Sequence, residues 1–354
     1  MIVNQWLAAA HRGDAIGDSA RRTRHLLQSL GHQSELFALT IDEDLEDEVR
    51  PFSDPAARGG DVTVLHYALP SPMTAALAAL DRGRVLHYHN VTPAAYFAPY
   101  DAALFRLAVL ARRELATLVG HVDLALGVSE FNRRELEALG FSPTGVLPLA
   151  VDTARLTEPV RRPAIERLLD DELVNFLFVG RIAPNKKIED HIFFAEHYKR
   201  YVDAYYRFIF VGRYDGVPNY YAMIRALISE FKMVEERFIF TGPVPDEELA
   251  VYYRHAAVYL SMSEHEGFCA PLVEAMAADV PILAYAAAAV SETLGGAGVQ
   301  FAPKDLEQAA ELAGRLVFDE DFRTGVIEGQ RRRLHDFGDA RIRRDLTRVL
   351  DSLS

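Results

Sequence analysis

The sequence predicts an α/β protein made of two units, each built on a parallel β-sheet. Three observations lead to this prediction. Short apolar runs alternate with helical patterns along nearly the whole chain, the alternation is interrupted once near its middle, and 354 residues with 50% hydrophobic content suffice for two cores. Such alternation favours right-handed βαβ connections. Two units of this kind, joined by a linker, are expected to face each other across a cleft.

Twelve apolar runs are predicted strands, six on each side of the interruption. The first six are residues 1–7, 34–39, 62–69, 84–90, 122–129 and 145–151. The second six are residues 175–180, 207–212, 237–242, 257–263, 280–285 and 298–302. Residues 152–172 gain proline and charge, as a linker does. The acidic stretch 42–54 is interpreted as a solvated loop, and residues 340–354 as an amphipathic helix that could pack on either unit.

Composition excludes several classes of protein. A formal net charge of −13 argues against a nucleic-acid binder, which needs a basic surface. The single cysteine, Cys269, excludes an internal disulfide framework and a cysteine-based zinc site, and it fits a reducing compartment. The N-terminal residues do not resemble a signal peptide, and no run approaches the ~20 apolar residues of a membrane helix. We therefore expect a cytoplasmic protein, with any membrane contact made from one face at the inner side of the membrane.

Candidate ligand-binding residues follow the predicted strands, where parallel sheets bind ligands. Gly13 and Gly17 precede a helical pattern that Asp18 or Ser19 could cap, so this loop is either a phosphate contact or a tight turn with a cap. Lysine and arginine follow the strand at 175–180, where cations can neutralise a diphosphate leaving group. These cations are Arg181 and Lys186, with Lys187 as a competitor of Lys186.

His89 ends the predicted strand 84–90, and His87 lies on the same face two residues earlier. His89 is nearer the expected cleft and is the better candidate for a functional role, although a hydrogen-bonded structural histidine is an equally frequent explanation. No third ligand at metal spacing accompanies the pair in the sequence. A zinc site is therefore not predicted.

Two glutamates, Glu266 and Glu274, lie on the loop and helix that follow the strand at 257–263, and Pro271 suits the first turn of that helix. Glu274 could simply be favoured near a helix N-terminus by the macrodipole. Glu266 lies on a glycine-containing loop beside that helix N-terminus. Its carboxylate can accept hydrogen bonds from sugar hydroxyls while backbone N–H groups bind a phosphate.

These residues resemble the motifs of retaining GT-B glycosyltransferases of family 4. Glu266 to Glu274 resembles their E-x7-E motif, "FVGRIAPNKK" (178–187) resembles their G-R…P-x-K segment, and residues 237–268 are similar to their second half. The resemblance implies two Rossmann-like domains. Residues 1–151 would bind the acceptor, residues 152–339 would bind a nucleotide-sugar donor, and the helix 340–354 would pack back on the first domain.

The resemblance also implies roles for individual residues. Arg181 and Lys186 would hold the donor diphosphate, Glu266 the sugar hydroxyls, and His89 would face the donor sugar. The remaining donor contacts would be Gly13, Gly17, Gly180, Lys187, Val244, Gly267, Phe268, Cys269 and Glu274, the last at the ribose. The glycine loop reads "GDAIGD" where many relatives have adjacent glycines. No D-x-D motif stands near the phosphate site, so neither a metal nor another cofactor is expected.

The implied function is retaining transfer of a hexose from a GDP- or UDP-sugar to an acceptor hydroxyl, in polysaccharide or glycolipid synthesis. The expected partners are the donor and a saccharide or lipid-linked acceptor. The alternatives are a non-catalytic sensor of nucleotide sugars and an enzyme of the same fold, namely a nucleotide-sugar epimerase or a phosphorylase. Arginines at 21–25 and 105–118 could form a basic face toward anionic lipid, but a solvated helix surface is the commoner explanation.

Overall fold

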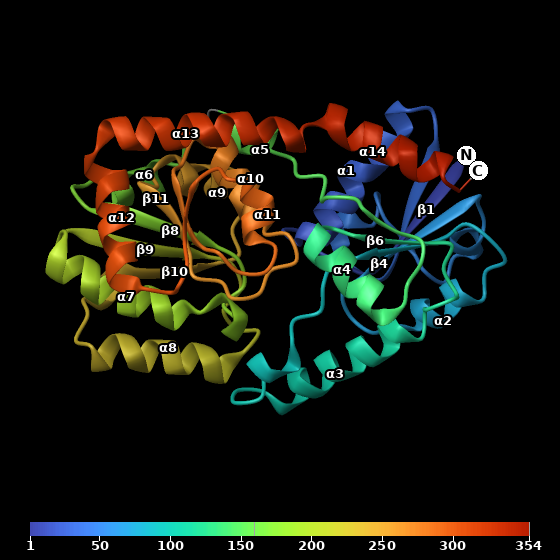
Figure 1. Ribbon diagram of the computed structural model, residues 1–354, viewed down its shortest axis with the longest axis horizontal. Helices are drawn as coiled ribbons and strands as arrows, with labels where there is room; N and C mark the ends of the chain where they lie inside the picture. Colours follow the sequence, from blue (N-terminus) through green and yellow to red (C-terminus); the bar gives the residue numbers. More distant parts are fainter. Residues whose placement is uncertain (159, 354) are drawn as a thin grey trace. The chain divides into compact units, whose positions relative to one another are not determined.

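The computed structural model describes residues 1–158 and 160–353, which form two compact units (Figure 1). Unit 1 comprises residues 1–95 and 103–152, together with the described residues from Asp336 onward. Unit 2 comprises Tyr96–Ala102 and Thr153–His335. Pro159 of the predicted linker and Ser354 of the predicted C-terminal helix lie outside the described residues.

Unit 1 contains a seven-stranded parallel sheet in the order β3-β2-β1-β4-β5-β6-β7. Its strands are β1 (Ile2–Ala10), β2 (Gln33–Ile41), β3 (Arg50–Pro51), β4 (Val62–Tyr67), β5 (Arg84–Tyr88), β6 (Leu124–Gly127) and β7 (Thr144–Val146). Its helices are α1 (Ala15–Ser29), α2 (Pro72–Ala78), α3 (Ala102–Ala116), α4 (Glu130–Leu139) and α14 (Asp339–Asp351).

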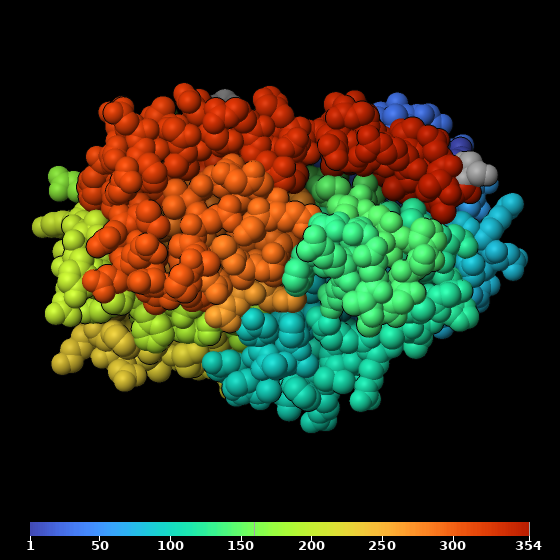
Figure 2. All heavy atoms as spheres, in the orientation of Figure 1, coloured from blue at the N-terminus to red at the C-terminus, as the bar shows by residue number. Residues whose placement is uncertain are grey.

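Helix α14 belongs to unit 1 although it ends the chain. Its apolar stripe, Ile342, Leu346 and Leu350, is buried against residues of β1 and α1 that include Val3 and Leu27. The opposite side of the helix carries arginines, and the space-filling view shows this helix on the surface of unit 1 (red in Figure 2). The amphipathic pattern of the sequence therefore has a direct structural use.

Unit 2 contains a six-stranded sheet in the order β10-β9-β8-β11-β12-β13, and neighbouring strands of this sheet run parallel. Its strands are β8 (Val174–Val179), β9 (Tyr206–Val211), β10 (Phe238–Gly242), β11 (Val258–Ser261), β12 (Ile282–Tyr285) and β13 (Val299–Phe301). Its helices are α5 (Ala154–Thr157), α6 (Pro163–Leu169), α7 (Ile188–Tyr201), α8 (Pro218–Glu230), α9 (Asp246–Arg254), α10 (Ala270–Ala277), α11 (Val290–Leu294), α12 (Leu306–Phe318) and α13 (Glu320–Leu334).

Each of the twelve predicted strands overlaps an observed strand, so the predicted fold class, two parallel α/β units, is confirmed. In both sheets the strand order reverses beside the first strand of the unit, which is where open parallel sheets bind their ligands. The predicted linker contains two short helices, α5 and α6. Among the described residues, no helix is both long and apolar enough to span a bilayer.

One face of the unit 2 sheet is aromatic, because phenylalanine alternates with aliphatic residues along β8, β9 and β10. The parallel register places Phe176 beside Phe208 and Phe208 beside Phe238, with stacked ring centroids 5.1 and 5.4 Å apart. On the other face, Leu177 and Ile209 join the aliphatic core under α9 and α10. The alternation thus sets the register, since a slip of one residue would exchange the two faces.

Glycines end three adjacent strands of unit 2, and Gly212 is the most constrained of them. Its φ is +133°, and a Cβ at this position would lie 2.4 Å from the carbonyl oxygen of Gly180, which precedes Arg181. Gly212 also donates its N–H to the Gly242 oxygen at 3.0 Å. Close packing of these strand ends therefore requires glycine.

We expect Gly212→Ala to lower the free energy of unfolding by about 3 kcal/mol, because strained backbone and a steric clash add at one position. Gly216→Ala is the matched control, since a Cβ there has no neighbour within 4 Å. The control should change the stability by less than about 0.5 kcal/mol. Denaturant unfolding measures both variants, and equal stabilities would contradict the close contact.

Two local predictions are wrong. Helix α1 begins at Ala15 and its N-cap is Asp14, which accepts a hydrogen bond from Gly17 N, so neither Asp18 nor Ser19 is the cap. The acidic stretch 42–54 is not a simple solvated loop. It includes β3 and buries Leu45, Val49 and Phe52, and the ring of Phe52 lies 4.9 Å from that of Trp6.

Residues Tyr96–Ala102 group with unit 2 although the prediction assigns them to the domain 1–151. The reason is their bonding. Asn219 donates to the Tyr100 oxygen at 2.8 Å, the rings of Tyr100 and Tyr220 lie 5.1 Å apart, and the Tyr96 hydroxyl lies 3.4 Å from Glu264 Oε2.

Candidate functional site

The loop that follows β8 carries the predicted cations. Gly180, with φ +149°, turns the chain out of the sheet, and Pro184 begins a single 3₁₀ turn, Pro184–Lys186. Arg181 is exposed and makes no ion pair with the residues that the structure describes. Its guanidinium is therefore available to an anionic ligand.

The loop that follows β11 is fastened to the β8 loop. The side-chain amide of Asn185 donates to the backbone oxygen of His265 at 2.9 Å. The backbone oxygen of Asn185 accepts from Glu264 N, also at 2.9 Å. These bonds bring Lys186 Nζ within 2.5 Å of Glu266 Oε1. Both side chains are largely buried, with 17% and 9% of their surfaces exposed. An ammonium and a carboxylate in such a place attract each other more strongly than in water.

The two neighbouring lysines have different partners. Lys187 Nζ lies 2.6 Å from Glu189, and this bond raises the pKa of Lys187 although burial acts to lower it. Lys186 is therefore the lysine that meets Glu266, and Lys187 starts helix α7 in the left-handed conformation, with φ +53°.

The entry to α10 presents backbone donors beside this ion pair. Cys269 has φ +69° and Pro271 lies in the first turn of the helix, as the sequence predicts. Gly267 N–H and Cys269 N–H donate no hydrogen bond to the described part of the chain. Burial and the nearby Glu266 carboxylate raise the pKa of the Cys269 thiol, so this side chain is neutral and packs as an apolar group.

Glu274 lies one turn into α10 and is only 5% exposed. Its Oε1 accepts from Arg155 Nη2 at 2.6 Å, and its Oε2 accepts from the Tyr253 hydroxyl at 2.9 Å. Burial, and then the Glu274 charge, raises the pKa of Tyr253, which therefore stays a donor. Each carboxylate oxygen has two lone pairs, so Glu274 can accept further bonds.

A network of ion pairs links Lys304 to the β11 loop and to α7, and the sequence does not predict it. Lys304 Nζ lies 2.6 Å from Asp190 Oδ2, 2.9 Å from Glu264 Oε1 and 3.0 Å from the Met262 oxygen. Burial raises the pKa of Asp190, against the effect of Lys304. The network holds the β11 loop against α7. No sequence signal reveals it, since 114 residues separate Lys304 from Asp190.

The other predicted contacts are dispersed. Val244 follows β10 and is half-buried against the core of unit 2, whereas Phe268 is buried, with its oxygen bonded to Thr293. Gly13 is exposed with φ +71°, and Gly17 is buried within the first turn of α1, in unit 1. Because Gly17 N donates to Asp14, this N–H is already engaged.

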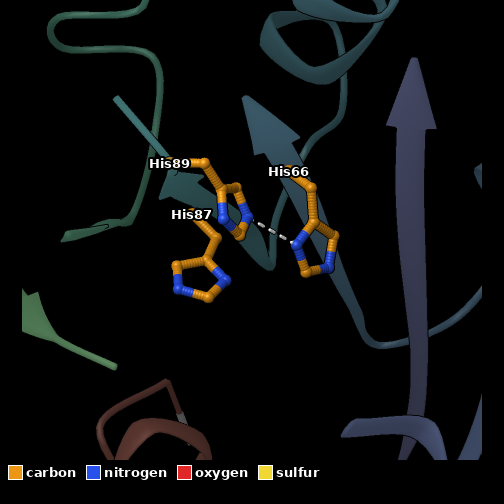
Figure 3. A group of neighbouring side chains, drawn as sticks. All are labelled: His66, His87 and His89. Carbon is orange, nitrogen blue, oxygen red and sulfur yellow. Dashed lines mark hydrogen bonds between the residues drawn. The ribbon is translucent and has the colours of Figure 1, made fainter. Parts of the chain in front are cut away.

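His89 belongs to a cluster of three histidines in unit 1 (Figure 3). The sequence predicts His87 as its neighbour and no third ligand. The structure adds His66, whose Nδ1 lies 2.9 Å from His89 Nε2. Burial lowers the pKa of all three, to about 4 for His87. A signal was present: "VLHY" occurs at 64–67 and at 85–88, and parallel pairing aligns the two copies.

The pH dependence of unit 2 offers a test of its packing. His191 is fully buried beside Phe178 and Phe210, and burial lowers its pKa to about 4. In the unfolded chain, His191 takes up a proton below pH ~6.5, whereas in the folded chain it stays neutral down to pH ~4. The free energy of unfolding therefore falls as the pH drops through this window. Between pH 7 and pH 4, the free energy of unfolding of His191→Phe should fall by about 3 kcal/mol less than that of the wild type. Denaturant unfolding at pH 7 and at pH 4 measures this difference. An equal fall in the free energy of unfolding of both proteins would contradict the prediction.

Two family models match consecutive parts of the chain. The model described as Glycosyltransferase Family 4 matches residues 54–155, and the model described as Glycosyl transferases group 1 matches residues 174–319. Among curated relatives, the serotype-specific mannosyltransferase WbdA of Escherichia coli is 27% identical over 154 residues, which are 44% of this chain and 18% of WbdA. A GDP-mannose-dependent alpha-mannosyltransferase of Mycobacterium tuberculosis (strain CDC 1551 / Oshkosh) is 26% identical over 233 residues, 65% of this chain and 57% of that protein.

The chain thus spans less than a fifth of WbdA and little more than half of the mycobacterial enzyme. Among solved structures, Anabaena HepE in complex with UDP and glucose aligns over 100% of both chains, with a TM-score of 0.71 and 18% identity. At this identity the likeness concerns the fold alone, which is the GT-B fold of two Rossmann-like domains. With both family models matched in sequence order, the chain belongs to the group 1 glycosyltransferases of the family 4 type.

Proposed function

We propose that this protein transfers a hexose from a nucleotide diphosphate sugar to an acceptor hydroxyl, with retention at the anomeric carbon. The acceptor class is a saccharide or a lipid-linked saccharide, in polysaccharide or glycolipid synthesis. GDP-mannose is the first donor to test, because curated relatives are named mannosyltransferases, one of them GDP-mannose-dependent. UDP-glucose is the second, since HepE has been solved in complex with it.

The observation that carries this proposal is the pair formed by Lys186 and Glu266. Their charged atoms lie 2.5 Å apart, on the loops that join β8 to α7 and β11 to α10, and Arg181 lies at the start of the first of these loops. Without a ligand, the two charges neutralise each other. A bound donor would replace this ion pair with separate contacts. Its diphosphate would accept from the Lys186 ammonium, and its sugar hydroxyls would donate to the Glu266 carboxylate.

The proposed reaction breaks the bond between C1 of the sugar and the diphosphate oxygen. A bond then forms between C1 and the acceptor oxygen on the same face, and the acceptor proton passes to the departing diphosphate. Lys186 and Arg181 would stabilise the charge that grows on the leaving group, and fixed charges of this kind lower barriers strongly. Glu266 is assigned to hydroxyl binding, so no covalent intermediate is expected, in contrast to retaining glycosidases.

Further residues of unit 2 are proposed to contact the donor. The free N–H groups of Gly267 and Cys269 would donate to the diphosphate, as peptide groups at a helix entry do. Glu274 would accept from the ribose, and the backbone around Val244 would meet the base. Gly180, Lys187 and Phe268 would shape the loops. The chemistry needs no divalent ion at the diphosphate, because two cationic side chains supply the charge.

Unit 1 would bind the acceptor, and the reaction roles of His89, Gly13 and Gly17 stay predictions. The basic face predicted at 21–25 is largely neutralised. Arg22 lies 2.8 Å from Asp339, and Arg24 lies 3.2 Å from Glu48. Peripheral contact with the inner face of the cytoplasmic membrane stays a prediction.

Thermal unfolding with GDP-mannose, UDP-glucose and ADP- and dTDP-sugars identifies the donor, because a ligand that binds only the folded state raises Tm. Transfer is then measured with the stabilising donor and a panel of saccharide and lipid-linked acceptors, and the anomeric configuration of the product is read by NMR. An inverted product would contradict retention. Binding without turnover would favour a sensor, and conversion of the donor without an acceptor would favour an epimerase.

A further inference from the structure

The three histidines of unit 1 form a cluster that strand pairing holds in place. β4 and β5 are parallel with His66 opposite His87, and His89 lies on the same face two residues beyond His87. Their ligand nitrogens all lie within 4.8 Å of one another. Figure 3 shows the rings of His66 and His87 turned toward His89 from the two strands.

Hydrogen bonds fix which nitrogen of His66 is free for a ligand. The Gln5 amide donates to the Ala20 oxygen and to Ser34 Oγ, each at 3.2 Å, so its Oε1 is the acceptor of the His66 Nε2 proton at 3.0 Å. The lone pair of His66 is then on Nδ1, which points to His89.

His87 is oriented in the same way. Its Nε2 donates to the Leu147 oxygen at 2.8 Å, which leaves the lone pair on Nδ1. A second acceptor that holds the far N–H of each imidazole is the usual support of metal-binding histidines.

His89 has a buried nitrogen without a partner. Its Nε2 meets His66 Nδ1 at 2.9 Å, but its Nδ1 makes no hydrogen bond with the described residues. In the free cluster the proton lies on Nε2, between the two rings. A cation placed there would move this proton to Nδ1, so that His89 Nε2 also offers a lone pair.

We propose that His66 Nδ1, His87 Nδ1 and His89 Nε2 form a binding site for a borderline divalent cation, Zn²⁺ above all. Imidazole suits this class of ion, and three protein nitrogens with one further ligand are a common zinc set. A tetrahedral ion with bonds of about 2.0–2.1 Å needs nitrogens roughly 3.3 Å apart, so the rings must shift by about an ångström. A cavity of about 20 Å³ adjoins His66 and His87.

The site lacks a carboxylate among its described ligands, so the ion would keep its charge unless an anion such as hydroxide supplies the fourth ligand. All three ligands of this site belong to unit 1. Its role would be to tie β4 to β5.

The test uses the full chain without a histidine tag, stripped with a chelator and titrated with Zn²⁺ against a fluorescent zinc indicator. We expect one Zn²⁺ per chain, and Mg²⁺ in large excess should not compete, since it prefers oxygen ligands. His66→Gln and His87→Gln should each weaken binding at least 100-fold. Gln5→Met, which removes the supporting acceptor together with the amide donor to Ala20 and Ser34, should weaken it 10- to 100-fold. His255→Gln is the control and should bind as the wild type does, because among the described residues this half-buried ring bonds only to Val251 in its own turn.

Circular dichroism checks that each variant folds. If His66→Gln or His87→Gln does not fold, His89→Gln at the strand end decides, together with the visible absorption of the Co²⁺ form of the wild type, which reports tetrahedral nitrogen ligands. The wild type failing to bind Zn²⁺ stoichiometrically, or binding that survives all three histidine substitutions, would overturn the proposal. The cluster would then be a hydrogen-bonded chain of neutral histidines only.

Discussion

Lys186→Met is expected to lower kcat/KM for sugar transfer by about 10³-fold, the usual loss when a fixed group that stabilises developing charge is removed. The Lys186 ammonium lies 2.5 Å from Glu266 and is only 17% exposed, so water screens its charge little. Methionine keeps the length of the side chain and removes the charge. Steady-state kinetics with varied donor measure the effect, and a fall mainly in kcat would indicate that the charge acts in the transition state.

A loss of stability must be separated from a loss of catalysis. Lys186→Met leaves the Glu266 carboxylate without its cation, at a cost of about 3 kcal/mol. The double variant Lys186→Met/Glu266→Gln removes both charges and should recover most of the stability but none of the activity. Lys199→Met, at the exposed end of α7, is the control and should retain full activity. If the double variant transfers sugar as the wild type does, the pair is structural and its assignment to the donor is wrong.

The fold was predictable wherever the hydrophobic pattern repeats with the period of the structure. β8, β9 and β10 each read as phenylalanine alternating with aliphatic residues, and the observed register pairs those phenylalanines. The segment 42–54 was not predictable in this way. Leu45, Val49 and Phe52 are single apolar residues among carboxylates, and only tertiary packing, such as the contact of Phe52 with Trp6, decides that they are buried.

The candidate site was predictable as far as its chemistry is local. Arg181, Lys186 and Glu266 lie at strand ends that the sequence marks with glycine and proline, so their loops could be located. Their partners could not be found, because pairs such as Arg155 with Glu274 bridge more than a hundred residues. The position of His66 could be predicted from the sequence. If the two strands that contain "VLHY" are neighbours in a parallel sheet, the repeat places His66 beside His87, as the structure shows.

Glu274→Gln is expected to weaken donor binding by about 10- to 100-fold, the range for a lost hydrogen bond to a charged group. Glutamine keeps an acceptor for the Tyr253 hydroxyl and removes the charge beside Arg155, whose guanidinium lies 2.6 Å from the carboxylate. Part of any effect could therefore come from Arg155. Measuring the stability and the donor affinity of Arg155→Gln beside those of Glu274→Gln gives the contribution of Arg155.

The ribose contact itself is isolated by changing the ligand. The nucleoside diphosphate of the identified donor is compared with its 2′,3′-dideoxy analogue, by calorimetry, on the wild type and on Glu274→Gln. If Glu274 accepts from ribose, the wild type prefers the intact ribose at least tenfold and the variant loses most of this preference, since the two changes remove the same bond. Equal discrimination by both proteins would mean that Glu274, 5% exposed and bonded on both oxygens, acts only within the core of unit 2.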